Sequence, residues 1–433
     1  LGGRISEEPF FEGIRDNFNN LKIRYSYGQL GNQNVGYYDY IRKISIGNQN
    51  YLFGGDKPTT ATISAPVASN LSWETSIHNN LGVDMSFLNN RLAFSADFYI
   101  RDTKDMLTAG VALPGVYGAD PPKMNSADLR TKGYELSLSW RDEFQLLRRP
   151  FTYSVTVTFN DYVTDITKYD NPDRTFAKSY YEGMRWGEIW GYRIGGLFAT
   201  DAEAAGYAVD QTAVNNRINA AAGSERGLHA GDLKFLDLDG DNIISIGKNT
   251  VDDPGDREII GNSQPRFHYG TTLSMSWAGI DFSIFFQGVG RRQWYPKANT
   301  IAFWGPYARP YSSFIPTTFL TDVWTEDTPD AYYPKARGYA AQGSRSLAQI
   351  NDRYLQNLAY CRLKNLTFGY TLPSSLTSKV GIERIRVYFS GDNLFTWTKL
   401  KSDYLDPEQM TSDANGRVYP FSKTYSFGVD ISF

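Results

Sequence analysis

The sequence is poor in cysteine, in histidine and in long apolar runs. Its single cysteine, Cys361, cannot form an internal disulfide, and a metal site built from paired cysteines is excluded. No run approaches the roughly 18 apolar residues that a membrane-spanning helix needs, which excludes a helical membrane protein but not a β-barrel. The three histidines are scattered, and the sequence has no nucleophile elbow, HExxH motif or phosphate-binding glycine loop. We therefore expect that the protein is not an enzyme.

Charge is nearly balanced, whereas aromatic residues are abundant. The 44 lysines and arginines against 47 acidic residues give a formal net charge of −3, so we expect no nucleic-acid partner. Tyrosine occurs 30 times and phenylalanine 26 times, which is more than is usual in a soluble enzyme. The opening residues LGGRISEE read like the end of a strand that runs into a turn, and we expect the sequence to be the C-terminal part of a longer protein.

Large apolar residues occupy every second position near the C-terminus, in the stretch SKTYSFGVDISF. The positions between them are small or polar, so the two sets lie on opposite faces of one strand. A soluble β-sandwich can also end in such a strand, and this stretch alone does not distinguish the two folds. The apolar set consists of Tyr425, Phe427, Val429, Ile431 and Phe433.

Nine further segments show the same alternation, and the links between successive segments are alternately long and short. Tight turns are indicated by Asn-Asn at 89–90 and Ala-Gly at 278–279, and short links also pass through Pro150 and Pro373. Long links on one side and short turns on the other are typical of outer-membrane barrels. We therefore predict an all-β fold, a transmembrane antiparallel β-barrel with long extracellular loops and short periplasmic turns, in preference to a soluble β protein. The long links are expected at 31–70, 102–131, 164–265, 291–353 and 399–420.

The strand faces opposite to the apolar ones carry charged residues. On the lipid side, each charge would cost up to about 2–4 kcal/mol near the membrane midplane. We therefore expect these residues to line a wet interior, so that the barrel is wide or is filled by something polar. They are Asp97, Arg101, Glu135, Arg386, Asp392 and Asp430.

The most specific local motif is DLDGDNIIS at 237–245, which has the spacing of an EF-hand loop. Carboxylates at its first, third and fifth positions can surround one hard cation, and the carbonyl at the seventh position adds a ligand. Gly240 permits the tight bend that this arrangement needs. The corresponding ligand residues are Asp237, Asp239, Asp241 and Ile243.

The motif departs from the EF-hand pattern at two positions. Asn242 stands where glycine is usual, although asparagine tolerates left-handed backbone angles. Lys248 occupies the twelfth position, where a bidentate acid is expected. An insertion displaces the next acids to Asp252, Asp253 and Asp256, and we assign Asp256 to the metal site. The expected cofactor is a structural Ca²⁺ ion in the link 164–265, and the alternative is an acidic, solvated turn.

Aromatic residues crowd two of the long links. Planar side chains beside polar groups suit the apolar faces of sugar rings or of peptide side chains, so we predict that they contact a substrate. The alternative is that they pack the loops against one another. The candidates are Trp186 in the link 164–265, and Trp294, Tyr295, Trp304, Tyr307, Tyr311, Phe314 and Trp324 in the link 291–353.

Blocks spread along the whole chain carry a resemblance to a known family. They include LKIRYSYGQLGNQ near the start, GEIWGYRIGGLF and GDLKFLDLDGDN in the centre, and RVYFSGDNLFTWTK near the end. In this order they resemble the C-terminal barrel portion of the SusC/RagA-like, TonB-dependent outer-membrane transporters. The resemblance implies that residues 1–433 are the C-terminal portion of a barrel of roughly 22 strands. It also implies that the N-terminal strands and an internal plug domain lie outside this sequence.

The same resemblance implies a function and partners. The expected function is TonB-dependent import of a large nutrient across the outer membrane of a Gram-negative bacterium, with a SusD-like surface lipoprotein over the barrel mouth and TonB as the energising partner. A dimer of transporter–lipoprotein pairs is a further expectation. The resemblance assigns an extracellular calcium site to the DLDGD loop. It also assigns a signal read by the barrel-assembly machinery to Phe433 and the apolar residues that alternate with it.

The substrate class stays open at this point. Oligosaccharide import and oligopeptide import fit the same architecture, and the residues do not separate them. The alternative from another class is a secreted, calcium-containing carbohydrate-binding β protein, which would be soluble without detergent.

Overall fold

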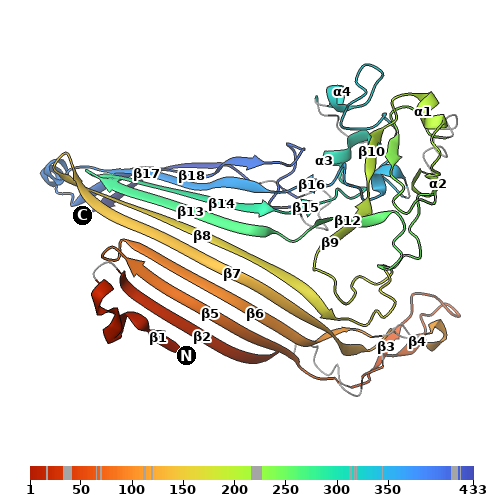
Figure 1. The fold of residues 1–433 in the computed structure, drawn as a ribbon, viewed down its shortest axis with the longest axis horizontal. Coiled ribbons are helices and arrows are strands. Elements are labelled where there is room, and N and C mark those ends of the chain that lie inside the picture. Colours follow the sequence, from red (N-terminus) through yellow and green to blue (C-terminus); the bar gives the residue numbers. More distant parts are fainter. Residues whose placement is uncertain are drawn as a thin grey trace.

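One antiparallel sheet of eleven strands dominates the structure (Figure 1). The computed structural model describes the chain apart from residues 16–17, 33–40, 65, 69–70, 111–113, 119, 216–226, 312–314, 316, 318, 344, 411–417 and 420. All ten expected strands are present, and β1 adds a short strand at one edge. In sheet order, the strands are β1 (Gly2–Arg4), β2 (Phe18–Asn32), β5 (Glu74–Phe87), β6 (Leu92–Ala109), β7 (Lys123–Leu146), β8 (Arg149–Lys168), β13 (Arg266–Trp277), β14 (Ile280–Arg291), β17 (Tyr360–Thr371), β18 (Arg384–Thr398) and β19 (Thr424–Ser432).

The short connections gather at one end of this wall and the long ones at the other (Figure 1). Asn89 and Asn90, between β5 and β6, have φ angles of 57° and 62°. Ala278 and Gly279, between β13 and β14, have φ angles of 53° and 89°. Left-handed turn residues match the twist of the flanking strands, and so they close tight hairpins. The expected asymmetry of long and short links is confirmed.

Two strands reach further towards the long links than the alternation predicts. β6 and β7 continue to pair beyond their expected ends, so the link expected at 102–131 shrinks to 110–122. Register shifts interrupt this ladder around Asp105, whose φ is 56°. Because a β-bulge moves the following side chains to the other face, the period-two signal is lost although the pairing continues. The other long links become 33–73, 169–265, 292–359 and 399–423.

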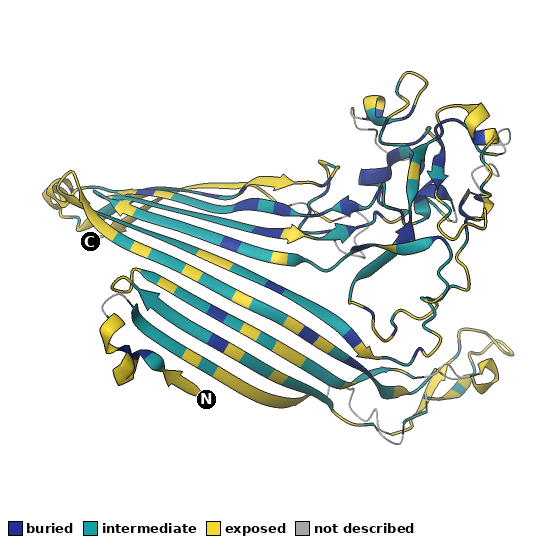
Figure 2. Cartoon of the chain, viewed as in Figure 1, coloured by how far each residue is buried: buried dark blue, intermediate teal, exposed yellow. Residues whose placement is uncertain are grey.

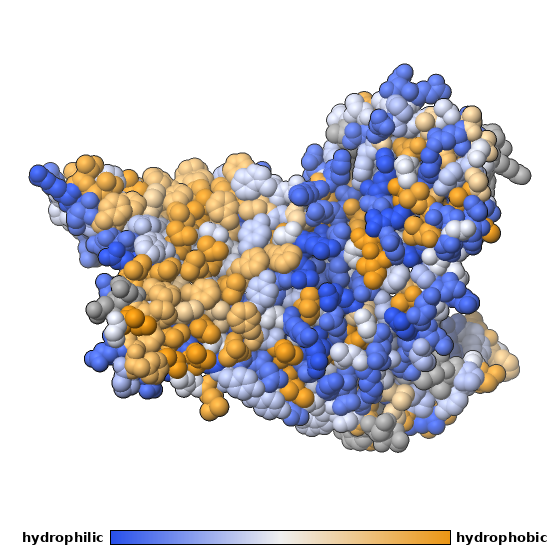
Figure 3. Space-filling model, in the orientation of Figure 1, coloured by the Kyte–Doolittle hydropathy of each residue, from blue (hydrophilic) through white to orange (hydrophobic). Residues whose placement is uncertain are grey.

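One face of the wall is apolar and exposed. Leu81, Phe98 and Leu138, on three neighbouring strands, keep 46%, 50% and 45% of their surface exposed. Figure 3 shows an apolar band across the wall, bordered by hydrophilic surface on the side of the long links. On β7, Lys132 and Asp142 limit this band and lie ten positions apart. This separation corresponds to about 25 Å for a strand tilted by roughly 40°, the height of the apolar belt of an outer-membrane barrel.

The opposite face of the wall is polar and is held together by ion pairs. The Nε of Arg24 lies 2.8 Å from Asp84, and its Nη2 lies 2.9 Å from Asp97, so one guanidinium joins β2, β5 and β6. Asn80 donates to the same Asp97 carboxylate over 2.8 Å. The charges expected on a wet interior therefore lie on the polar face. A second cluster of this kind consists of Arg386, Asp281 and Asp430.

The largest buried core of the described residues lies among the long links rather than in the sheet (Figure 2). We call this part the loop assembly; it is built from described residues of the links 169–265, 292–359 and 399–423. Trp304, Phe235 and Tyr354 have no exposed surface there. Within the described part of the chain, no helix is both long and apolar enough to cross a membrane.

Short elements complete the fold. The small strands are β3 (Ile44–Asn48), β4 (Thr59–Ile63), β9 (Glu188–Tyr192), β10 (Ile194–Leu197), β11 (Leu233–Phe235), β12 (Arg257–Asn262), β15 (Gln293–Trp294) and β16 (Gln356–Asn357). The helices are α1 (Asp201–Ala205), α2 (Thr212–Asn215), α3 (Ile301–Trp304), α4 (Phe319–Asp322) and α5 (Ser374–Thr377), with 3-10 turns at Ile5–Glu7, Pro9–Ile14, Gly115–Tyr117, Gly305–Tyr307, Ser346–Ala348 and Ser378–Val380.

Candidate functional site

The DLDGD loop lies in the loop assembly, between β11 and β12. Its first carboxylate organises the turn, because Asp237 accepts hydrogen bonds from the backbone N–H groups of Gly240 (2.7 Å) and Asn242 (2.9 Å). Gly240 has a φ of 84° and Asn242 a φ of 64°, so asparagine adopts the left-handed conformation that glycine usually supplies at this position. Ile244, which follows the turn, is fully buried in the core of the loop assembly and anchors it.

Asp256 joins this loop from outside the motif. A carboxylate oxygen from each of Asp237, Asp239 and Asp256 lies within 4.8 Å of the others. Asp256 is fully buried, and its two oxygens accept the N–H groups of Leu238 and Ser245, both over 2.7 Å. Asp256, the acid displaced by the insertion, therefore folds back onto the start of the motif. Its hydrogen bonds to Leu238 and Ser245 hold the loop at two points.

The remaining acids of this region have other partners. Asp252 lies 2.9 Å from Arg174, and Asp253 lies 3.6 Å from Lys248, the residue at the twelfth position of the motif. The carboxylate of Asp241 accepts the N–H of Ile243 over 2.7 Å and does not belong to the group of three. A role for Asp241 and for the Ile243 carbonyl as ligands stays a prediction.

The group of three carboxylates carries uncompensated negative charge. Among the described residues, none of the three forms an ion pair with a lysine or arginine. The backbone hydrogen bonds from Asn242 and Gly240 lower the pKa of Asp237. The pKa of Asp239 lies above its ordinary value: the N–H of Asp241 lowers it, but desolvation and the neighbouring carboxylates together raise it more. Oxygen donors held this way suit a hard divalent cation such as Ca²⁺.

Four of the seven described aromatic candidates are buried. Trp304 and Tyr307 are 0% and 1% exposed, and Trp294 and Trp324 are 5% and 6% exposed. Trp304 donates its indole N–H to the carbonyl of Pro296, and its ring packs edge-on against Phe303 and Tyr354. These four side chains pack the loops against one another in this structure, and a substrate contact by them stays a prediction.

The other candidates differ in exposure. Tyr311 is 90% exposed. Trp186 is half-buried and stacks on Tyr180, with ring centroids 5.1 Å apart. Tyr295 is half-buried and donates its hydroxyl to the carbonyl of Leu347. A substrate contact by these three stays a prediction, and Phe314 lies outside the described residues. Exposed aromatics of other long links, among them Trp73, Tyr404 and Tyr419, were not expected from the sequence to contact a substrate.

The apolar residues of the last strand face outward from the wall. Val429 pairs with Val387 and Phe427 with Phe389, so β19 continues the apolar face of β18. Phe427 is 82% exposed and Phe433 is 89% exposed. Tyr425, Val429 and Ile431 keep 49–61% of their surface exposed. The expected role of these residues in barrel assembly stays a prediction.

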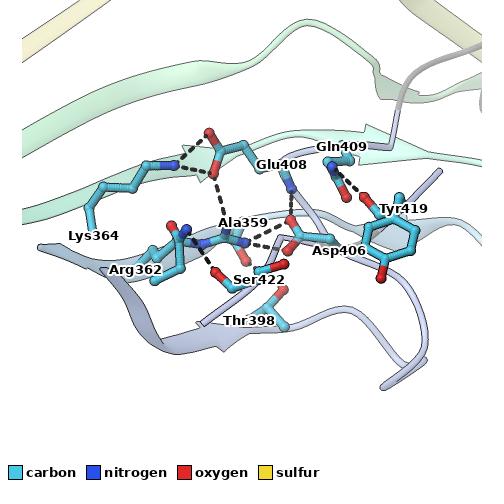
Figure 4. Close-up of polar contacts among 10 residues, drawn as sticks. Ala359, Arg362, Lys364, Thr398, Asp406, Glu408, Gln409, Tyr419 and Ser422 are labelled. Carbon is cyan, nitrogen blue, oxygen red and sulfur yellow. Dashed lines mark hydrogen bonds and ion pairs between the residues drawn. The ribbon is translucent and has the colours of Figure 1, made fainter. Parts of the chain in front are cut away.

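The polar face of β17 carries a buried charge that the sequence analysis did not identify (Figure 4). Arg362 is 1% exposed, and its Nη2 donates to both carboxylate oxygens of Asp406, over 2.7 and 2.6 Å. Glu408 lies 3.2 Å from Nη1 of Arg362 and 3.4 Å from Lys364. The ring of Phe421 lies 4.8 Å from the guanidinium. This cluster ties the link 399–423 back onto the strand.

Comparisons with known proteins agree with this architecture. The family model described as TonB dependent receptor-like, beta-barrel matches residues 13–394. TonB-dependent receptor P3 of Formosa agariphila is 28% identical, over 95% of this chain and 39% of its own length. TonB-dependent receptor SusC of Bacteroides thetaiotaomicron is 25% identical, over 100% of this chain and 39% of its own length.

A solved structure, titled as that of the RagAB peptide transporter, shares the fold. It superposes on 100% of this chain with a TM-score of 0.72 and 23% identity, and the match covers 42% of that chain. This chain thus spans about two fifths of the length of the relatives it matches. The chain belongs to the TonB-dependent receptor-like β-barrel family, which places it in the bacterial outer membrane and confirms that it is not an enzyme.

Proposed function

We propose that this chain is the C-terminal barrel portion of a TonB-dependent importer that carries a large nutrient across the outer membrane. The observation that carries the proposal is the family match over residues 13–394, which includes most of the barrel wall. The structure supports it through the division of the wall into an apolar face and a polar face, because a transport path through a barrel needs a hydrated lining.

The substrate class that we favour is an oligosaccharide. The exposed aromatic rings of the long links support this choice, because their planar faces suit sugar rings. Tyr311, Tyr404 and Tyr419 are the best placed, with 90%, 58% and 84% of their surface exposed. An oligopeptide is the second candidate, because the fold is shared with a transporter whose title names peptides.

The partners that we propose follow from the same relatives. A SusD-like surface lipoprotein would cover the end of the barrel that carries the loop assembly, and TonB would act through a part of the protein outside this sequence. The large, packed loop assembly supports a lid partner, since it offers a structured surface rather than isolated loops. Co-purification of a surface lipoprotein with the full-length protein from native outer membranes tests this pairing.

Uptake by living cells tests the transport proposal. Cells that carry the full-length gene should accumulate fluorescently labelled oligosaccharides, whereas cells without this gene or without TonB should not. Labelled oligopeptides of similar size provide the comparison between substrate classes. Uptake of both probes at the same rate with and without the gene would contradict the import function. Uptake of the peptides alone would keep the importer and replace the substrate.

We also propose that Asp237, Asp239 and Asp256 bind Ca²⁺ as a structural ion. Three acidic oxygen donors within 4.8 Å of one another, which have no basic partner in the described part of the chain, support this assignment. The ion would neutralise the repulsion that, together with desolvation, raises the pKa of Asp239, and it would hold the turn against the buried Asp256. An acidic, solvated turn is a weaker account, because it leaves the convergence of a fully buried carboxylate on two others unexplained.

Replacing Asp237 and Asp239 together by alanine should abolish calcium binding and loosen residues 232–262. When the calcium concentration is about a hundred times the dissociation constant, binding stabilises the folded state by about 2.7 kcal/mol. The double variant would lose this contribution. Metal analysis and hydrogen exchange of this segment measure the two effects. Asp252→Ala is the matched control, because this acid pairs with Arg174 and lies outside the group. Calcium content that is equal in the double variant and the control would rule out the site.

A further inference from the structure

A shallow groove of about 440 Å³ crosses the outer face of the wall near its long-link end. Its floor is the backbone of four residues that the register aligns across β5, β6, β7 and β8: Asn80, Tyr99, Gly133 and Tyr162. The side chains of Asn80, Tyr99 and Tyr162 point to the interior, and an added Cβ at Gly133 would lie 2.5 Å from the Tyr99 ring. The residues on either side of this row therefore point outward. They form the two walls of the groove: Leu81, Phe98, Tyr134 and Asp161 on one side, and Asn79, Ile100, Lys132 and Val163 on the other.

The groove lies where the apolar band of the wall ends. Phe98 and Ile100 keep 50% and 41% of their surface exposed, and the Tyr134 ring contacts those of Phe98 and Phe159. Aromatic rows of this kind mark the interface between hydrocarbon and lipid headgroups. Lys132 limits the band on β7, so the groove opens at the height of the headgroups. Because it lies outside the barrel, its surroundings do not depend on what fills the lumen.

Two basic side chains line the groove. Lys132 is exposed and has no carboxylate partner among the described residues. Arg266 donates from Nε and Nη2 to the two carboxylate oxygens of Asp161. Such a bidentate pair fixes the guanidinium plane and leaves the hydrogens of Nη1 for another acceptor.

A polar cleft of about 420 Å³ continues the groove towards the loop assembly, and Arg266 lines both. Arg185 and Arg291 also line the cleft, together with Asp165 and Glu188. Arg185 is paired with Asp165 over 3.1 Å. Arg291 lies opposite Arg266 in the register, is exposed, and has no carboxylate partner in the described part of the chain. An apolar groove therefore leads into an arginine-lined cleft at headgroup height.

We propose that the groove and the cleft together bind an acylated, phosphate-bearing lipid of the outer leaflet. The acyl chain would lie against Leu81, Phe98 and Ile100, where its burial removes apolar surface from the headgroup region. The phosphate would accept hydrogen bonds from Nη1 of Arg266 and lie between the positive charges of Lys132 and Arg291. The headgroup charge is opposite to theirs, and charge-assisted hydrogen bonds to phosphate are the strong ones. This site is separate from the transport path through the barrel.

Native mass spectrometry of the full-length transporter tests the site, with lipid A and dephosphorylated lipid A as probes. The wild-type protein should retain lipid A in preference to the dephosphorylated form. The double substitution Lys132→Glu with Arg291→Glu should lower the retention of lipid A by at least about tenfold, since each lost charge-assisted contact contributes a factor of this order. Retention of the dephosphorylated lipid should change little, because the apolar groove stays intact.

Two further variants keep the test specific. Lys399→Glu changes an exposed lysine at the same end of the wall but beyond β18, and it should retain lipid A as the wild type does. Ile100→Trp fills the groove and should lower the retention of both lipids. Equal retention of lipid A by the wild-type protein and the double variant would overturn the proposal. A double variant that loses self-association but keeps its lipid would also overturn it, and would assign this face to a second copy of the protein.

Discussion

Replacing Arg362 by alanine is expected to release the link 399–423 from the wall of the barrel. The guanidinium is 1% exposed and is shared by the carboxylates of Asp406 and Glu408, whose side chains are 15% and 24% exposed (Figure 4). Removal of the cation leaves the half-buried Asp406 carboxylate without its ion-pair partner, and leaves Glu408 with Lys364 alone. Breaking a buried ion pair in this way costs about 3–5 kcal/mol, and the partial exposure of the carboxylates favours the lower end of this range.

Hydrogen exchange in the full-length protein measures this release. The backbone amides of residues 399–410 should lose protection by roughly a hundredfold or more, which corresponds to about 3 kcal/mol. Lys364→Ala is the matched control. Lys364 lies 3.4 Å from Glu408 and is 28% exposed, so its loss should cost no more than about 1 kcal/mol. Equal effects of the two substitutions would mean that burial of Arg362 does not determine the stability of the link.

A positive charge at Leu138 is expected to destabilise the inserted barrel by about 2–4 kcal/mol, because arginine at the membrane midplane carries this cost. Leu138 is 45% exposed on the apolar face of β7, between the limits of the apolar band at Lys132 and Asp142. Its cross-strand neighbours are Phe94 and Val157. Leu138→Arg should lower the denaturant midpoint of the barrel in liposomes and reduce the amount of protein in the outer membrane.

The next residue along the chain provides the control for this substitution. Ser137 lies between Ser95 and Thr158 on the polar face of the same strand, so Ser137→Arg places the same charge in a hydrated interior. It should change the midpoint by less than about 1 kcal/mol. A larger loss from Ser137→Arg than from Leu138→Arg would reverse the assignment of the two faces.

Most of the sheet could be predicted from the sequence, because period-two alternation is a local signal and every regular strand carries it. β19 is the clearest case, with four apolar residues at alternate positions and Phe433 directly after it. The signal failed where bulges occur. β17 begins at Tyr360, six residues before its first expected residue, and its register shifts between Leu363 and Asn365. Arg362 lies before this shift, and for this reason its inward position could not be read from the pattern.

The sequence predicted the arrangement of the DLDGD loop better than it predicted the positions of the aromatic residues. The spacing of the DLDGD motif predicts that Asp237 and Asp239 lie together, because these two residues are close in sequence. Asp256 lies beyond an insertion, so the motif spacing gave no reason to prefer it to Asp252; in the folded chain Asp256 joins the group, whereas Asp252 pairs with Arg174. Burial of Trp304 depends on contacts with distant links, and amino-acid composition does not contain that information.

The most direct test of the account is the position of the two faces of β7 relative to the lipid. Nitroxide labels at Leu138→Cys and at Ser137→Cys, each in a full-length protein that carries Cys361→Ser, can be compared after reconstitution into liposomes. We predict that oxygen dissolved in the bilayer relaxes the label at position 138, on the apolar face. A water-soluble nickel chelate should relax the label at position 137, on the polar face. Equal access of the nickel chelate to both labels would contradict a membrane-spanning wall with one lipid-facing and one hydrated side.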